Sequence, residues 1–141
     1  MTERTAVDDR PGGGRISLAR YLWAAPASAL GLGLALPDLP RGGARMAGGV
    51  LEVDGPVLRW GLTHLVPLPG GAAALTLGHV VLGRDRQALE SSRTHERVHV
   101  RQYERWGPLL VPAYLLASVW AWARGGHIYL DNVFEREAQR G

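Results

Sequence analysis

The sequence predicts an α+β fold in which a small antiparallel sheet packs on a long helix, followed by an apolar helix and a short C-terminal helix. Three observations support this prediction. Strand-like runs fill residues 49–83, a proline-free helical pattern follows from Asp85 to Trp106, and an apolar stretch over residues 107–123 precedes a last helical segment. The length of 141 residues suits one domain with a sizeable core.

The chain begins with a polar segment and then becomes apolar. Residues 1–15 are charged and contain the run Pro-Gly-Gly-Gly, which predicts a disordered tail. We expect residues 16–40 to form an apolar helix or a membrane anchor, and a signal peptide or a buried core helix are the alternatives. The apolar run of residues 21–37 reaches only the lower length limit of a membrane span, and Pro26 weakens it further.

The strand-like runs lie on either side of turn residues. The runs of residues 49–53 and 56–62 flank Asp54-Gly55, a dipeptide typical of β-hairpins, and Pro56 suits the start of a strand or an edge position. A glycine-rich loop then leads to a third run, residues 75–83. Three strands with one covered face can be stable where a single hairpin cannot.

A long helix is expected from Asp85, a good N-cap residue, to Trp106. Its arginines at positions 93, 97, 101 and 105 recur every four residues, so this row faces water, lipid headgroups or acidic groups from elsewhere in the fold. Gly107-Pro108 ends the helix, and the apolar residues 107–123 follow. The last helix is expected over residues 132–139.

Composition limits the chemistry that is available. All 16 basic residues are arginines, and they are scattered without interleaved aromatic residues, so we expect no nucleic-acid binding. The chain has no cysteine, so any metal site must be built from histidine, glutamate and aspartate.

One motif on the long helix carries specific chemistry, the sequence His95-Glu96-Arg97-Val98-His99. Histidines four residues apart lie on one helix face with their Cβ atoms about 6 Å apart, so both rings can reach one zinc ion. Glu96 points about 100° away around the helix, which suits a general base that takes a proton from an attacking water. A catalytic zinc site also needs a third protein ligand.

The motif and the later run Glu135-Arg136-Glu137-Ala138 together resemble gluzincin zinc peptidases. In that family a glutamate three residues before an alanine or aspartate, on a later helix, completes the site. The resemblance covers roughly residues 75–139 and implies that Zn²⁺ is held by His95, His99 and Glu135. It also implies that Glu96 is the general base in the hydrolysis of a peptide bond in a peptide or protein substrate. We expect the zincin-like domain to extend over residues 41–141. Glu137 is the alternative third ligand, since only one of the two acids can face the metal.

The segment HERVHVRQYERWGPLLVPAYLLAS, with DNVFEREA after it, is also similar to small bacterial membrane-associated proteins of unassigned function. This second resemblance implies association with the bacterial cell membrane. The alternative to a peptidase is therefore a non-catalytic membrane-associated interaction protein with a structural metal or none.

Several further polar residues are candidates for supporting roles. Gln102 lies one turn after His99 and is expected either to orient that ligand or to be exposed. His127 and Tyr129 are the nearest donors for an oxyanion, whereas His64 and His79 are expected to be structural. The strand Leu75–Val81 would lie beside the long helix and could hold an extended peptide.

The zinc hypothesis constrains the second apolar stretch. If residues 107–123 crossed a bilayer, about 30 Å of hydrocarbon would separate Glu135 from His95 and His99. The stretch must therefore be a buried core helix, or a helix lying in the membrane interface with Trp120 and Trp122 at headgroup level.

Overall fold

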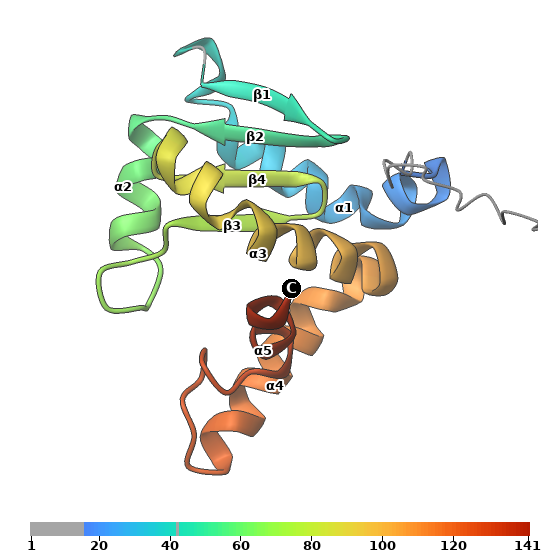
Figure 1. The fold of residues 1–141 in the computed structure, drawn as a ribbon, viewed down its shortest axis with the longest axis vertical. Coiled ribbons are helices and arrows are strands. Elements are labelled where there is room, and N and C mark those ends of the chain that lie inside the picture. Colours follow the sequence, from blue (N-terminus) through green and yellow to red (C-terminus); the bar gives the residue numbers. More distant parts are fainter. Residues whose placement is uncertain (1–15, 42) are drawn as a thin grey trace, which may run out of the picture.

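The computed structural model describes residues 16–41 and 43–141, so the predicted tail of residues 1–15 lies outside the described part of the chain. The predicted α+β class is confirmed. Figure 1 shows a four-stranded sheet between two helices, with α3 (Arg86–Trp106) on one face and α1 (Leu18–Ala35) on the other. The first apolar stretch is thus a helix with one face against the sheet.

The sheet is mixed, which corrects the expectation of a purely antiparallel one. Its strands are β1 (Ala44–Ala47), β2 (Val50–Asp54), β3 (Ala74–Leu77) and β4 (Val80–Gly83), in the order β1-β2-β4-β3. β1 and β2 form one hairpin, β3 and β4 form another, and the two hairpins join through the parallel pair β2 and β4. The predicted single run of residues 75–83 is therefore two strands, separated by a tight turn at Gly78, where φ is +63°.

The predicted strand of residues 56–62 is wrong, because these residues belong to α2 (Pro56–His64). Pro56 occupies the first helical turn, where its missing N–H costs nothing. The buried Asp38 carboxylate accepts hydrogen bonds from the backbone N–H groups of Val57 and Leu58, at 3.3 and 2.8 Å, and so caps the helix from another part of the chain. Because β2 runs parallel to β4, the chain needs a crossover here and not a hairpin turn.

The two faces of the sheet follow the alternation of its strands. Val53, Val80 and Leu82 pack towards α1, whereas Val50 and Val81 pack with Leu89 and Val100 of α3. Small residues of α1 are buried against the sheet: Ala24, Ala27, Gly31 and Ala35. At Gly31 a Cβ would lie only 2.9 Å from Val80 Cβ, so close packing of this helix requires glycine there.

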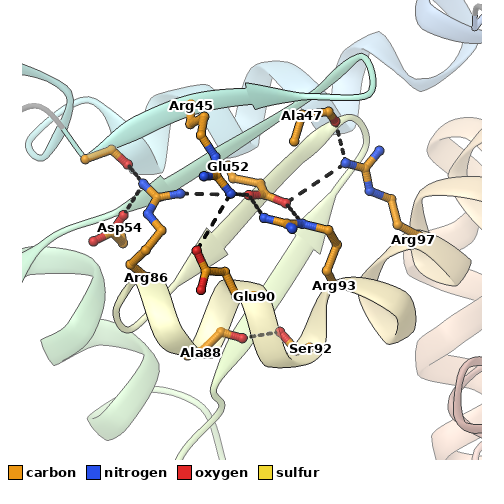
Figure 2. Close-up of polar contacts among 11 residues, drawn as sticks. Arg45, Ala47, Glu52, Asp54, Arg86, Ala88, Glu90, Ser92, Arg93 and Arg97 are labelled. Carbon is orange, nitrogen blue, oxygen red and sulfur yellow. Dashed lines mark hydrogen bonds and ion pairs between the residues drawn. The ribbon is translucent and has the colours of Figure 1, made fainter.

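A cluster of arginines around a buried carboxylate fastens α3 to the sheet. Glu52 on β2 is only 2% exposed. The Nε and Nη2 atoms of Arg93 donate to its two carboxylate oxygens at 2.8 and 2.9 Å, and Figure 2 shows Arg45, Arg86 and Arg97 converging on the same group. Part of the arginine row predicted on this helix therefore faces an acidic group from the sheet.

The chain leaves α3 through a short 3-10 turn, Gly107–Leu109, and continues as α4 (Leu110–Ala123) in a different direction (Figure 1). Within the described residues one helical stretch, Arg86–Ala123, is long and apolar enough to cross a membrane by length and composition. Residues 124–132 turn back, and α5 (Val133–Arg140) packs against α3. A buried core helix was one expectation for residues 107–123, but most large side chains of α4 are exposed.

Candidate metal centre

Three side chains predicted as metal ligands come together between α3 and α5. Each offers one ligand atom, and the three atoms all lie within 4.8 Å of one another. His95 and His99 lie one turn apart on α3, and Glu135 comes from the first turn of α5. His99 and Glu135 are buried, while the His95 side chain is 26% exposed and forms the open side of the group. The structure describes a group that could hold a metal ion.

The spacing of the two histidine donor atoms fits a tetrahedral ion, and each oxygen of the Glu135 carboxylate lies close to one of them. Zinc bonds of about 2.0–2.1 Å in a tetrahedral site place neighbouring donor atoms about 3.3 Å apart. The two Nε2 atoms of His95 and His99 are 3.2 Å apart. Glu135 Oε2 lies 3.2 Å from His95 Nε2, and Glu135 Oε1 lies 3.3 Å from His99 Nε2. Two imidazoles and one carboxylate also form a donor set that zinc commonly uses.

Electrostatics prepare these groups for a cation. Burial, the largest influence on Glu135, would raise its pKa, but the adjacent His95 and His99 rings and the Tyr114 hydroxyl outweigh it and hold that pKa well below its ordinary value. Burial would likewise lower the pKa of His99, but the Glu135 carboxylate outweighs it and raises that pKa above the ordinary value. The carboxylate is thus held ionised, which is the form that binds a metal ion.

Buried hydrogen bonds fix the orientation of two of the three groups. Gln102 is completely buried, and its Nε2 donates to Phe134 O at 3.0 Å and to Glu137 Oε2 at 2.8 Å. Its Oε1 therefore accepts from His99 Nδ1 at 2.9 Å, which leaves Nε2 as the His99 ring nitrogen that faces Glu135 and would bind a metal ion. The Tyr114 hydroxyl donates to Glu135 Oε1 at 2.7 Å. Of the two expectations for Gln102, the structure favours orientation of the ligand.

Glu96 lies beside the ligands but outside their group. It is buried on the side of α3 that faces the sheet, where the Thr76 hydroxyl of β3 donates to its Oε2 at 2.6 Å. This contact joins the predicted general base to the edge strand of the sheet. Glu96 lies about 100° around the helix from His95. Its side chain therefore contacts Thr76 of the sheet, whereas the His95 ring contacts His99 and Glu135.

The remaining candidates lie elsewhere. Glu137 is directed at Arg105 and Gln102 and is not one of the grouped ligands. His64 stacks on Trp60, and His79 hydrogen-bonds to Glu104, so neither belongs to the group. His127 is exposed, and its ring accepts backbone hydrogen bonds within its own loop.

Tyr129 is half-buried near the ligand group. Burial, and then the nearby Glu135 carboxylate, raises the pKa of Tyr129 well above the usual value of tyrosine. Its hydroxyl therefore stays protonated and able to donate.

Sequence reasoning did not identify Thr76 and Tyr114 as parts of this site. Thr76 occupies an inward position of a short strand, which the alternation of the run could have indicated once the strand was divided at Gly78. Tyr114 lies in an apolar stretch, and nothing in its local sequence relates it to Glu135, which follows 21 residues later. Only the return of the chain after α4 brings the two together.

Comparison with known proteins adds no family to these observations. No protein-family model matches the chain, and neither does any curated protein or solved structure with which it was compared. What remains is the group of His95, His99 and Glu135, which is compatible with an His-Glu-x-x-His site.

Proposed function

We propose that this protein is a zinc-dependent metallopeptidase-like hydrolase whose site corresponds to that of the gluzincins. The observation that carries the proposal is that the ligand atoms of His95, His99 and Glu135 lie within 4.8 Å of one another, with the two histidine Nε2 atoms 3.2 Å apart, an edge length that suits a tetrahedral zinc site. A zinc ion held there would polarise a substrate carbonyl and lower the pKa of water.

The protein's own residues supply the proton transfers and the orientation. Glu96 takes the proton of the attacking water and returns it to the leaving amine. The Thr76 hydroxyl holds Glu96 Oε2 and leaves the other carboxylate oxygen for this exchange. Gln102 and Tyr114 keep His99 and Glu135 in position, and the protonated Tyr129 hydroxyl near Glu135 is available to a developing oxyanion.

The substrate we propose is an extended peptide. β3 is an edge strand of the sheet, so its outer backbone groups can pair with an added strand. Because Thr76 of this strand contacts Glu96 directly, a peptide bound along β3 would pass beside the general base.

Metal analysis of purified protein and of single variants tests the proposal. We expect one zinc per chain in the wild type, loss of zinc in His95→Ala and Glu135→Ala, and retention of zinc in Glu137→Ala. Glu96→Gln should keep its zinc and lose turnover of a peptide library, since Glu96 is a base and not a ligand. Purified wild type without zinc, or with zinc that Glu135→Ala leaves unchanged, would refute the metal site.

A structural metal is the second candidate, because the ligands come from two helices that residues 107–132 separate in the sequence. An ion would then hold α5 against α3 without catalysis. In that case zinc is bound and the same variants lose it, but the wild type turns over no peptide in the library and Glu96→Gln behaves like the wild type.

A further inference from the structure

The outward side of α4 is an uncharged apolar face. No charged residue occurs from Gly107 to Ala123. One side of α4 packs inwards through Leu110 and Ala121, whereas the opposite side leaves large apolar side chains exposed. These exposed residues, which we call the α4 face, are Leu109, Val111, Leu115, Leu116, Val119, Trp120 and Trp122. A continuous apolar face of this kind usually marks an interaction surface.

A second apolar face adjoins the first. The outward side of α1 exposes Leu18, Leu22, Trp23, Leu30 and Leu34, and no charged residue occurs between Arg20 and Asp38. Trp23 connects the two faces, because its ring fills the space beside Gly107 and its Nε1 donates to Arg105 O at 3.2 Å. The apolar surface therefore continues from α1 onto the base of α4.

Positive charge borders this surface. Arg105 precedes α4 and Arg124 follows it, and the Arg124 guanidinium lies 5.6 Å from the centre of the Trp120 ring. A cleft of about 820 Å³ lies between the end of α4 and α5, and Trp120 is part of its wall. The cleft is lined by three arginines, Arg124, Arg136 and Arg140, and by two carboxylate side chains, those of Asp131 and Glu137. None of these three arginines forms an ion pair with a carboxylate of the described residues.

We propose that the α4 face binds the surface of an anionic lipid bilayer, with α4 lying in the headgroup region and the arginine-lined cleft receiving lipid phosphate. The tryptophans at the end of α4 suit this depth, where aromatic rings concentrate. Arg124, Arg136 and Arg140 add positive charge beside the end of α4, and such charge near a bilayer attracts anionic headgroups. Because α5 returns to α3, the chain enters and leaves the membrane from one side.

The charge distribution favours a bilayer over a second copy of this chain. A symmetric dimer through the α4 face would bring the same patch of each subunit together, and with it the arginines beside the cleft. Such like charges repel one another, whereas anionic headgroups neutralise them. This inference does not depend on the metal site or on peptidase activity.

Co-sedimentation with vesicles tests the proposal. The probes are vesicles of phosphatidylcholine alone and of phosphatidylcholine with phosphatidylglycerol at about 3:1, an anionic content of the kind that basic interfacial helices recognise. We expect binding to the anionic vesicles, a blue shift of tryptophan fluorescence, and at least about tenfold weaker partitioning for Leu116→Glu. Arg124→Gln combined with Arg136→Gln should remove the preference for phosphatidylglycerol.

A matched control separates binding through the α4 face from nonspecific hydrophobic adsorption. Leu65 follows α2 and is as exposed as Leu116, each at 70%, so Leu65→Glu should partition like the wild type. Circular dichroism of Leu116→Glu, with a wild-type spectrum, would show that the fold is retained. Failure of the monomeric wild type to bind anionic vesicles would overturn the proposal. So would equal losses in Leu65→Glu and Leu116→Glu, or a wild-type dimer that Leu116→Glu converts to monomer.

Discussion

Gln102 shows how a single side chain that is not a ligand can decide the geometry of the candidate metal centre. It is fully buried, accepts from His99 Nδ1, and donates to the backbone of α5 and to Glu137. It therefore fixes the tautomer of one ligand and the position of the helix that carries another. Partners of this kind are the usual reason that a histidine ligand is held in one orientation.

Gln102→Leu is expected to weaken zinc affinity by about 10–100-fold, because His99 loses its orienting acceptor. Competition with a chromophoric chelator measures the effect. Gln139→Leu, which changes an exposed glutamine of α5, is the control and should bind zinc like the wild type. An unchanged affinity in Gln102→Leu would show that His99 is oriented by other means.

At this scale the sequence predicted some of the site and left the rest open. The spacing of His95 and His99 fixes their common helix face, so these two could be paired without a structure. The choice of Glu135 over Glu137 depended on the resemblance to gluzincins, because the residues alone do not fix the rotation of α5 about its axis. That rotation is set by contacts across the fold, including those from Gln102 to Phe134 and Glu137.

Among the elements, α5 is positioned by Asn132. This fully buried residue caps α5 through Oδ1, which accepts from Phe134 N at 2.9 Å. Its Nδ2 donates to Tyr114 O and Ser118 Oγ of α4, at 3.0 and 2.8 Å. The Asn132 side chain thus joins α4 to α5 and fixes the start of α5, the helix that carries Glu135 in its first turn.

Asn132→Ala should lower the free energy of unfolding by about 2–3 kcal/mol, the sum of a lost cap and two buried hydrogen bonds. Asn132→Asp keeps the cap acceptor and loses the donor, so its loss should be smaller. Urea unfolding of the metal-free proteins gives both values. Equal stability of Asn132→Ala and the wild type would contradict the assigned role.

The Glu52 cluster in Figure 2 makes the attachment of α3 to the sheet sensitive to acid. The hydrogen bonds from Arg93 hold the pKa of Glu52 below its ordinary value of 4.5, with burial opposing and the charges of Arg93, Arg45 and Arg97 assisting. Because this pKa is lowered on folding, the stability it contributes is complete above about pH 4.5 and is lost as the pH falls through the folded value.

Glu52→Gln should destabilise the protein by about 1–3 kcal/mol at pH 7, since partly exposed arginines are left without their carboxylate. It should also reduce the loss of melting temperature between pH 5 and pH 3. Thermal unfolding across this range measures both effects. Glu90→Gln is the control, because Glu90 is half exposed and lies 4.0 Å from one arginine of the cluster. Parallel pH profiles for Glu52→Gln and the wild type would rule out this role.

The elements themselves were predicted unevenly, for identifiable reasons. The long helix, its start at Asp85 and its end at Gly107 follow from local capping and breaking residues, and they are confirmed. α2 was missed because Asp54-Gly55 is typical of a hairpin. The residue that favours a helix here is Asp38, whose carboxylate caps the start of α2 although it lies 20 residues before Leu58 in the sequence. The parallel pairing of β2 with β4 is also a long-range choice, which alternation within one strand cannot reveal.

For the whole molecule, metal binding and stability should be coupled, because the proposed ligands come from helices at the two ends of a long connection. Zinc at about a thousandfold excess over its dissociation constant would add about 4 kcal/mol. Chelation should therefore lower the melting temperature by on the order of 10 °C. Differential scanning calorimetry with and without chelator measures this shift. His95→Ala should show no shift, and a wild type equally indifferent to chelator would argue against a bound ion.

The kink at Gly107 has a consequence for where cleavage could occur. His99 precedes it by 8 residues, which is about 12 Å of helix. With α4 seated among headgroups, the reactive centre would stand a fixed short height above the lipid. Polypeptide close to the membrane surface, such as the stalk just outside another protein's anchor, would then reach this centre more readily than a chain free in solution.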